Sequence, residues 1–393
     1  MHKLIAPSML AASLLATAAQ AAGPDKLSIA VYGDSPYGTS NADTVQFSAT
    51  PAFIKSINAD PDVSLVLHVG DIHSGQQQCT LEYDQSIYNA WNGLQPVAAS
   101  GLPVLVNPTA FRFPVVYTPG DNEWTDCQKT NESRPPKPGN ADPIQNLGWI
   151  RSIFFANPGH TLVVDKPVWS QHVYFDPAYP TDAQYVENVI WEQSGVVFVT
   201  LNIPGGSNND TDNWLGATDQ PAAQTTEILN RTGADLRWLD RAFALAEVDH
   251  ANAVVIEIQA DMWDLDGKAP SHIGAYRQFV DSIALHTSDF GKPVLLLNGD
   301  SHTYRSDNPL AEGASCVTEN PVDQSTEVAC PEDAYNNQPN GYNVPNFHRI
   351  VVHGSTGKME WLKLNVKPGA SVGRESASSF GPFSWQRMIQ PLP

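Results

Sequence analysis

The sequence is poor in basic residues. Lysine and arginine together number 22, against 42 aspartates and glutamates, which gives a formal net charge of −20 in a chain of 393 residues. Such an acidic chain repels nucleic acid and anionic membrane surfaces, so we expect neither as a partner. It would also repel a polyanionic substrate unless a bound cation reverses the field locally.

Cysteine is also scarce. The chain has only Cys79, Cys127, Cys316 and Cys330, and no two of them form a Cys-x-x-Cys pair, which argues against a zinc site made of cysteines. An even number of cysteines in an oxidising compartment predicts two disulfides. Of the three possible pairings we favour Cys79 with Cys127 and Cys316 with Cys330. The first two each lie a few residues after a Gly-Asp step, so a bridge there would join two neighbouring loops.

Beyond the N-terminal segment the chain has no apolar run long enough to span a bilayer. The one long apolar run follows Lys3 and ends in Ala19-Gln20-Ala21, which is typical of a cleaved signal peptide over residues 1–22. We therefore expect a periplasmic or secreted protein, with residues 23–393 as a single domain. A Gly-x-Ser-x-Gly motif is absent too, which argues against the nucleophile elbow of α/β-hydrolases.

The sequence does contain four Gly-Asp steps, and each ends a β-like run. They are Gly33-Asp34, Gly70-Asp71, Gly120-Asp121 and Gly299-Asp300. The glycine lets the backbone turn sharply, and the aspartate then lies at the carboxyl end of a buried strand, where open α/β sheets bind their ligands. Four carboxylates at one rim would repel one another, and a divalent metal is the simplest partner that neutralises them.

Strand and helix patterns alternate in the first half of the chain, and a strand-rich stretch follows. Strands are predicted over 27–33, 64–70, 113–118, 168–175, 188–192, 196–202, 253–258, 294–298, 347–353 and 359–366. Helices are predicted over 81–95, 144–155, 226–248 and 275–285. This order predicts an α/β fold with a two-sheet core flanked by helices. Residues 306–346, about 40 in all by that numbering, are rich in proline, asparagine and aspartate, and we expect a disulfide-stapled surface insertion there.

The polar residues at the strand ends follow a fixed order. They read Asp34-Ser-Pro, Gly-Asp71-Ile-His73, Gly-Asp121-Asn122-Glu123, Gln259 after an apolar strand, and Gly-Asp300-Ser-His302. This series resembles the calcineurin-like metallophosphoesterases, a superfamily that includes the purple acid phosphatases. The resemblance covers most of the chain, from residue 27 to about 305. It implies a β-sandwich of two sheets in αββα layers, and hydrolysis of a small phosphate mono- or diester by metal-activated water.

The resemblance also implies a ligand set. One metal would be held by Asp34, Asp71 and His302, and a second by Asp71, Asp121, Gln259 and Asp300, with Asp71 as the bridge. Several positions that are histidine in the family are not histidine here: Pro36, Asn122, Gln259 and Asp300. Because oxygen then dominates the donor set, we expect one or two divalent ions of the oxygen-preferring kind, with Mn, Mg or Ca favoured over Zn and Fe possible.

The catalytic roles are less directly implied. Asn122 stands where the family has its catalytic histidine, and a one-residue slide would make Asn122 a ligand and Glu123 the acid. His73 is the nearest spare imidazole, and Arg305 could hold a phosphate with two hydrogen bonds.

Two other functions stay open. Gly33-Asp34-Ser35 resembles the opening motif of GDSL-type serine esterases, with Ser35 as the nucleophile. That family needs a later Asp-x-x-His, and Asp300-Ser301-His302 is one residue short of it. The third possibility is a non-catalytic relative of the same fold that binds one structural cation or none.

Overall fold

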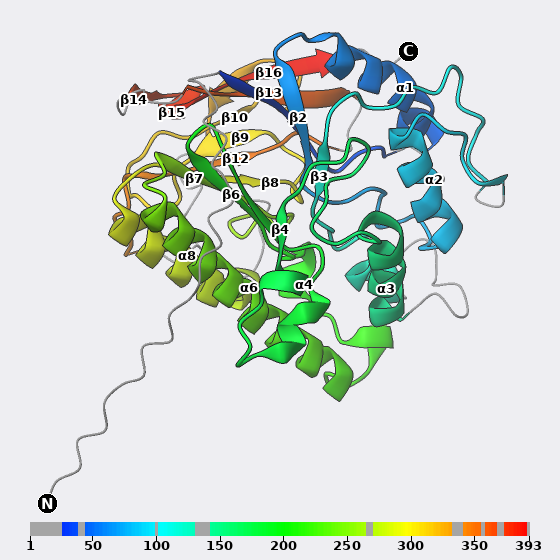
Figure 1. Ribbon diagram of the computed structural model, residues 1–393, viewed down its shortest axis with the longest axis horizontal. Coiled ribbons are helices and arrows are strands. Elements are labelled where there is room, and N and C mark those ends of the chain that lie inside the picture. Colours follow the sequence, from blue (N-terminus) through cyan, green and yellow to red (C-terminus); the bar gives the residue numbers. More distant parts are fainter. Residues whose placement is uncertain are drawn as a thin grey trace, which may run out of the picture.

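The computed structural model describes residues 26–37, 44–98, 101–129, 142–264, 270–331, 341–354, 358–367 and 373–390. The predicted signal peptide lies outside these residues. Within them the chain is an α/β protein with two mixed β-sheets and helices on both sides (Figure 1).

The first sheet has seven strands in the described part of the chain, in the order β14-β15-β16-β13-β1-β2-β3. Its parallel half consists of β1 (Leu27–Tyr32), β2 (Val63–His68) and β3 (Val115–Tyr117). Its antiparallel half consists of β13 (Met359–Val366), β14 (Gly373–Ser376), β15 (Ser379–Gly381) and β16 (Phe383–Gln390). The two halves meet where β1 pairs with β13 antiparallel.

The second sheet has nine strands among the described residues, in the order β11-β10-β9-β12-β8-β7-β6-β5-β4. Four of them run parallel: β6 (Val196–Thr200), β7 (Ala253–Glu257), β8 (Val294–Asn298) and β12 (Phe347–Val351). The others are β4 (Trp169–Ser170), β5 (Val189–Gln193), β9 (Arg305–Asp307), β10 (Val317–Glu319) and β11 (Glu327–Ala329). The parallel strands of both sheets are almost wholly buried, as is typical of strands covered on both faces.

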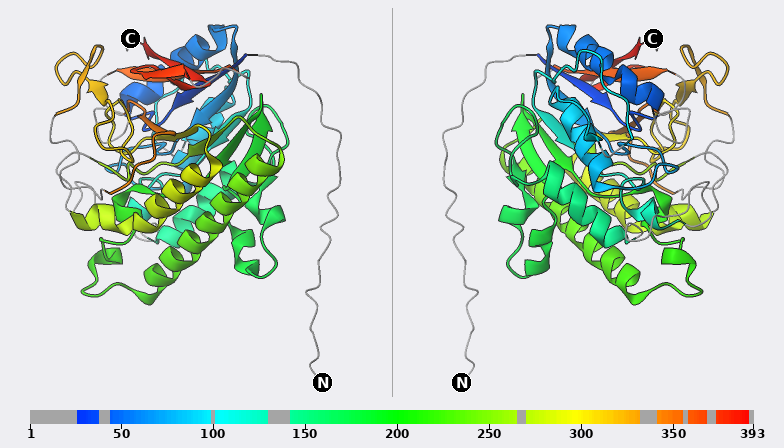
Figure 2. Two further views of the ribbon diagram at one scale, coloured as in Figure 1. Left: turned by 90° about the vertical axis from the view of Figure 1, so that its left-hand side faces the viewer. Right: turned by 90° about the vertical axis from the view of Figure 1, so that its right-hand side faces the viewer.

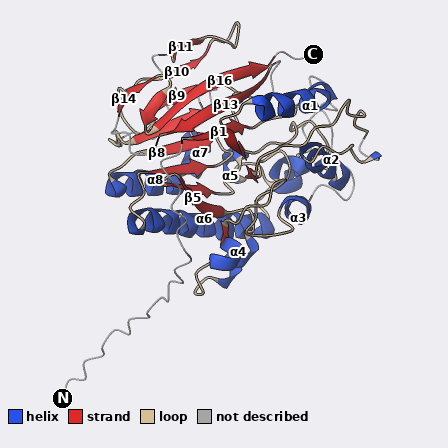
Figure 3. Ribbon diagram, turned by 45° about the horizontal axis from the view of Figure 1, so that its top comes forward, coloured by secondary structure: helices blue, strands red, loops and turns tan. Residues whose placement is uncertain are grey.

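Three apolar clusters define the layers. One lies between the sheets and joins Ile29 and Leu67 of the first to Phe198 and Leu297 of the second. A second packs α1 (Thr44–Ala59), α2 (Leu81–Trp91) and α3 (Pro143–Phe154) with the first sheet. A third packs α6 (Ala222–Val248) and α8 (Arg277–Phe290) with the second. The strands therefore lie between two groups of helices, which Figure 3 shows in red and blue. Figure 2 shows α6 and α8 side by side on one outer face.

Local chemistry sets the helix ends. Helix α2 begins after Thr80, whose hydroxyl accepts the Tyr83 N–H at 3.1 Å, and α3 begins after Asp142, whose carboxylate accepts the Ile144 N–H at 2.9 Å. Proline follows Asp142 at the first helical position, where its missing N–H costs nothing. Helix α8 ends at Gly291, whose φ of 65° closes the last turn.

The predicted class, an α/β protein with two sheets and flanking helices, is confirmed. The long strand predicted over 168–175 is wrong. Only β4 forms, and α4 (Gln171–Tyr174) follows because the Ser170 hydroxyl accepts the His172 N–H at 3.2 Å and caps a helical turn. The helix predicted at 275–285 corresponds to α8, and the short helix α7 (Pro270–Ala275) before it was not predicted. Strands β14 to β16 were not predicted, and the segment predicted as an insertion adds β10 and β11 to the sheet edge.

Both predicted disulfides are confirmed. Cys79 pairs with Cys127 and Cys316 with Cys330, with Cα atoms 5.7 and 5.4 Å apart. Two disulfides are consistent with the predicted oxidising compartment. No helix in the described ranges is both long and apolar enough to cross a membrane.

Candidate metal centre

The four predicted aspartates come together where the parallel strands of both sheets end. Asp34 follows β1, Asp71 follows β2, Asp121 follows β3 and Asp300 follows β8. Three of them have left-handed backbones, with φ of 47° at Asp34, 58° at Asp71 and 74° at Asp300, and His302 has φ of 62°. That conformation costs roughly 1–2 kcal/mol for each non-glycine residue. Several such residues in one place are typical of functional sites, because the surrounding structure must hold them there.

Glycines let the loops approach the carboxylates closely. A Cβ placed on Gly120 would lie 2.0 Å from Asp71 Oδ1, and one on Gly299 would lie 2.4 Å from Asp34 Oδ2. A Cβ on Gly354, which follows β12, would lie 2.2 Å from the Asp34 Cβ. Any larger residue at these three positions would push the aspartates apart, so the site depends on the glycines as much as on the acids.

Asp34, Asp71 and His302 form the best candidate for a metal-binding group. Each offers one ligand atom, and these three atoms lie within 4.8 Å of one another. Asp34 Oδ1 accepts the Asp300 N–H at 3.1 Å and lies 3.5 Å from His302 Nε2. Asp34 Oδ2 is buried and has no hydrogen-bond partner among the described residues, although a buried carboxylate oxygen normally has one. An unsatisfied oxygen beside a second carboxylate and an imidazole fits a divalent cation.

The electrostatics of these carboxyl groups also favour a bound cation. The pKa of Asp34 is raised to about 8, mainly by burial, with the charges of Asp121 and Glu123 acting in the same direction and the hydrogen bond from the Asp300 N–H acting against them. Burial, followed by the charge of Asp121, raises the pKa values of Asp71 and Asp300 well above the ordinary range. These carboxyl groups cannot all ionise together without a counter-charge, which a cation would supply while displacing protons.

The residues predicted for a second metal also come together, but around an amide. Gln259 is fully buried, and its Nε2 donates to Asp71 Oδ2 at 3.1 Å and to Asp121 Oδ1 at 3.0 Å. Its Oε1 accepts the N–H of Gly205. Asp300 Oδ2 accepts the Asp261 N–H at 3.0 Å. The predicted role of Gln259 as an oxygen ligand therefore stays a prediction, and in this conformation its nitrogen faces the carboxylates.

Asn122 and Glu123 act on the carboxylates from different sides. The Asn122 side chain donates to Asp71 Oδ2 at 3.0 Å and to the Tyr37 hydroxyl, and its N–H donates to Asp71 Oδ1 at 3.2 Å. Glu123 is fully buried, and its Oε1 accepts the Gly120 N–H at 2.7 Å, the Tyr117 hydroxyl at 2.7 Å and the Asp71 N–H at 3.2 Å. Glu123 thus links the loop after β2 to the loop after β3.

His73 and Arg305, predicted as catalytic, face other partners. His73 is fully buried, with Nε2 at 3.9 Å from Asp84 Oδ1 and Nδ1 at 3.0 Å from the Ser74 carbonyl. Arg305 is buried with its Nη1 at 3.4 Å from Asp261 Oδ2. Through these contacts both side chains stabilise the structure around the site, and their predicted catalytic roles stay predictions.

Ser35, the alternative nucleophile, is buried beside Asp34. Its Oγ has no hydrogen-bond partner in the described part of the chain, so no base is placed to take its proton. Its backbone instead links the loops, because the Ser35 N–H donates to the Asp71 carbonyl at 3.1 Å.

Sequence reasoning missed three contributors. Tyr37 is buried, accepts a hydrogen bond from Asn122 and packs edge-on against the His302 ring at 5.5 Å. The Gly205 N–H donates a hydrogen bond to the Gln259 side chain. The Asp261 N–H donates to Asp300, and the Asp261 carboxylate accepts hydrogen bonds from the buried Arg305 and Arg349. Only Asp261 had a signal, because it follows the same strand end as Gln259.

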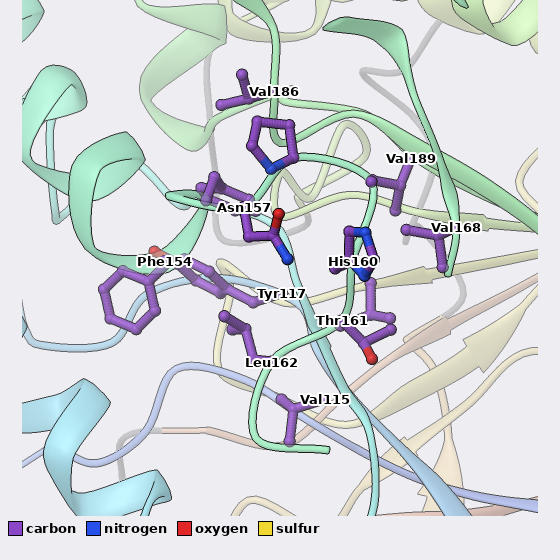
Figure 4. A pocket seen from close by; sticks show the side chains of 14 residues that line it. Val115, Tyr117, Phe154, Asn157, His160, Thr161, Leu162, Val168, Val186 and Val189 are labelled. Carbon is purple, nitrogen blue, oxygen red and sulfur yellow. The ribbon is translucent and has the colours of Figure 1, made fainter. Parts of the chain in front are cut away.

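A separate cavity lies behind β3. Its lining comes from β3, the end of α3 and the segment up to β5, and Figure 4 shows Asn157 and His160 among mainly apolar side chains. It has room for about one water molecule, so it is packing space and no ligand pocket.

No protein-family model matches this chain, and no curated protein matches it either.

Proposed function

We propose that this protein is an exported, metal-dependent hydrolase of small phosphate mono- or diesters, built as a divergent calcineurin-like metallophosphoesterase in αββα layers. The observation that carries the proposal is the Asp34, Asp71 and His302 group, in which both carboxylates are buried and one Asp34 oxygen is unsatisfied among the described residues. The order of strand-end motifs adds support, because each motif follows the predicted strand.

The chain's own residues have distinct tasks in this proposal. Asp34, Asp71 and His302 would hold a divalent cation, which when bound supplies a Lewis acid for the phosphoryl group and lowers the pKa of water. Asn122 orients Asp71 through two hydrogen bonds, and Glu123 fixes the loop that carries it. His302 is the most accessible of the three ligands, with 34% of its side chain exposed, so the substrate would approach from its side.

The test uses the purified protein with p-nitrophenyl phosphate and bis(p-nitrophenyl) phosphate. We expect hydrolysis that stops with EDTA and returns with Mn²⁺ or Mg²⁺. Asp34→Asn should lower the affinity for Mn²⁺, measured by calorimetry, and the activity by at least about 100-fold, because loss of a mere second-shell partner already costs 10–100-fold. Asp165→Asn, on an exposed side chain, is the matched control.

Activity that survives EDTA but is lost with a serine-directed reagent would favour the esterase reading built on Ser35. A cation that binds without hydrolysis of either ester would favour the non-catalytic relative. That second candidate has one observation in its favour: Asn122 has no proton that titrates near neutrality, so it cannot serve as a general acid.

A further inference from the structure

We infer that the centre takes one divalent cation per chain, and that the Gln259 amide occupies the place between Asp71 and Asp121 where a second cation would otherwise be needed. The inference rests on the proposed function, because it counts the cation that this function requires. Three features of the described residues support it: the orientation of the amide, the saturation of Asp71, and the backbone packed against Asp121 and Asp300.

The orientation of the Gln259 amide is fixed by its surroundings. A backbone N–H can only donate, so the atom that faces Gly205 N–H must be the amide oxygen. The amide nitrogen then points to Asp71 Oδ2 and Asp121 Oδ1, and its two hydrogens meet one carboxylate each. Turning the amide over would set an NH₂ group against the Gly205 N–H and leave an oxygen against two carboxylates. Both contacts would be repulsive.

Asp71 has little capacity left to bridge two metals. Its Oδ2 accepts from both Gln259 and Asn122, which fills the two acceptor sites of a carboxylate oxygen. Its Oδ1 accepts only the Asn122 N–H at 3.2 Å among the described hydrogen bonds, so one acceptor site on that oxygen can still take a cation. This matches a single cation shared with Asp34 and His302.

The third feature is the main chain at Gly205, which lies against Asp121 and Asp300. A Cβ placed on Gly205 would lie 2.6 Å from Asp300 Oδ1 and 2.8 Å from Asp121 Oδ2, so the main chain already packs against these two oxygens. Asp300 Oδ2 is held by the Asp261 N–H. Among the described histidines, cysteines and acids, no group other than Asp34, Asp71 and His302 brings three ligand atoms as close together.

One substitution reverses this arrangement. Gln259→Glu removes the two N–H donors between Asp71 and Asp121 and puts carboxylate oxygens in their place. Three carboxylates would then face one another, and a divalent cation is the natural counter-charge. A matched control is Gln171→Glu. Gln171 is equally buried, donates to the Ala234 carbonyl at 2.9 Å and accepts from Asn188 at 2.8 Å, and it belongs to α4 rather than to the strand-end loops.

The experiment measures bound manganese by elemental analysis after equilibrium dialysis against Mn²⁺. We expect one ion per chain in the wild type and in Gln171→Glu, and a doubling to two in Gln259→Glu. Asp121→Asn should leave the wild-type count at one, because Asp121 is held by the amide and not by a cation. Two ions in the wild type, or a count of one in well-folded Gln259→Glu, would overturn the inference.

The outcomes separate this inference from the proposed function. No bound ion in the wild type would overturn both. Two ions in the wild type, falling to one in Asp121→Asn, would overturn only the single-cation inference and leave a metal-dependent hydrolase. If Gln259→Glu does not fold, the counts for the wild type and Asp121→Asn still decide, since the single-cation centre requires one ion in each.

Discussion

At the scale of single residues, the burial of Glu257 at the end of β7 should make the stability of the protein depend on pH. It is 1% exposed, and neither of its carboxylate oxygens has a hydrogen-bond partner in the described structure. Burial raises its pKa well above the ordinary value of 4.5. The folded protein therefore keeps this proton at pH values where the unfolded chain has lost it.

The resulting pH dependence can be isolated by Glu257→Gln. Above about pH 4.5 the unfolded state binds fewer protons at this position than the folded state, so its contribution to stability falls as pH rises towards the folded pKa. The variant lacks this loss. We expect its free energy of unfolding, relative to wild type, to rise between pH 5 and pH 8 in urea titrations. Glu247→Gln, on the exposed side of α6, should show no such trend, and a parallel pH profile for Glu257→Gln would contradict the prediction.

Single residues also show what the sequence could reveal about the centre. Asp34, Asp71, Asp121 and Asp300 were predictable because each signal is local: a β-like run, a glycine and an acid. The role of Gln259 was not, because its amide is oriented by the N–H of Gly205, which lies 54 residues away in the chain. The burial of His73 and Arg305 was hidden for a similar reason, since their partners Asp84 and Asp261 come from other segments.

Among the elements, the connection after β6 has an unusual backbone. Gly206, Ser207, Asn208 and Asn209 all have φ between 57° and 65°, which makes a left-handed turn beside the centre. Buried Arg231 of α6 holds it, donating to Asn208 Oδ1 at 2.6 Å and to the Asn208 carbonyl at 3.1 Å. The strain is therefore offset by a buried network and keeps Gly205 against the carboxylates.

Leu215, in the short 3₁₀ helix Trp214–Gly216 that follows, allows the cost of such a backbone to be measured. Its φ is 57° and its side chain is 58% exposed, so Leu215→Gly should raise the free energy of unfolding by up to about 1 kcal/mol. Leu229→Gly is the control with the opposite sign. That side chain is 67% exposed within α6, and glycine there should cost about 1 kcal/mol. Equal signs for the two variants in urea unfolding would contradict the argument.

The two disulfides should differ in their effect on the centre. The Cys79–Cys127 bridge spans 48 residues, whereas Cys316–Cys330 spans 14. The two sulfurs of the first bridge lie 3.4 and 3.7 Å from the carbonyl oxygen of Asn122. Replacing each pair by serine should cost about 4 and about 3 kcal/mol respectively on chain-entropy grounds. Only loss of the first should also weaken Mn²⁺ binding in calorimetry. Equal weakening by both would show that the first bridge does not position the centre.

The elements also mark the limit of local patterns. Strands β8 and β13 were predicted with their observed bounds, since β8 is a continuous run of buried positions and β13 is buried at all but two of its positions. Strands β14 to β16 were missed because they are partly exposed strands, and because they join the sheet only through the pairing of β16 with β13, which local patterns do not reveal. Strand 168–175 failed because a two-residue capping contact at Ser170 outweighed its apolar composition.

At the scale of the whole molecule, the centre lies where two sheets meet, so its charge state should affect global stability. Without a cation the clustered carboxyl groups must stay partly protonated or repel one another. With Mn²⁺ at 100 times its dissociation constant, the folded state should gain about 2.7 kcal/mol. We expect the melting temperature in scanning fluorimetry to rise with Mn²⁺ and fall with EDTA. Asp34→Asn should abolish both changes, and a wild-type melting temperature indifferent to EDTA would contradict a metal centre.

The hydrogen bond from the Asp300 N–H to Asp34 joins positions 266 residues apart, and Gly354 closes on Asp34 from still further along the chain. A ribosome that has made only the first 290 residues has produced Asp34 and Asp71 without His302, the third proposed ligand. In the proposed metal centre, cation uptake would then be the last event of maturation, after synthesis and folding are complete. The ion would come from the compartment in which the finished protein folds, and its acquisition would report that both sheets are correctly assembled.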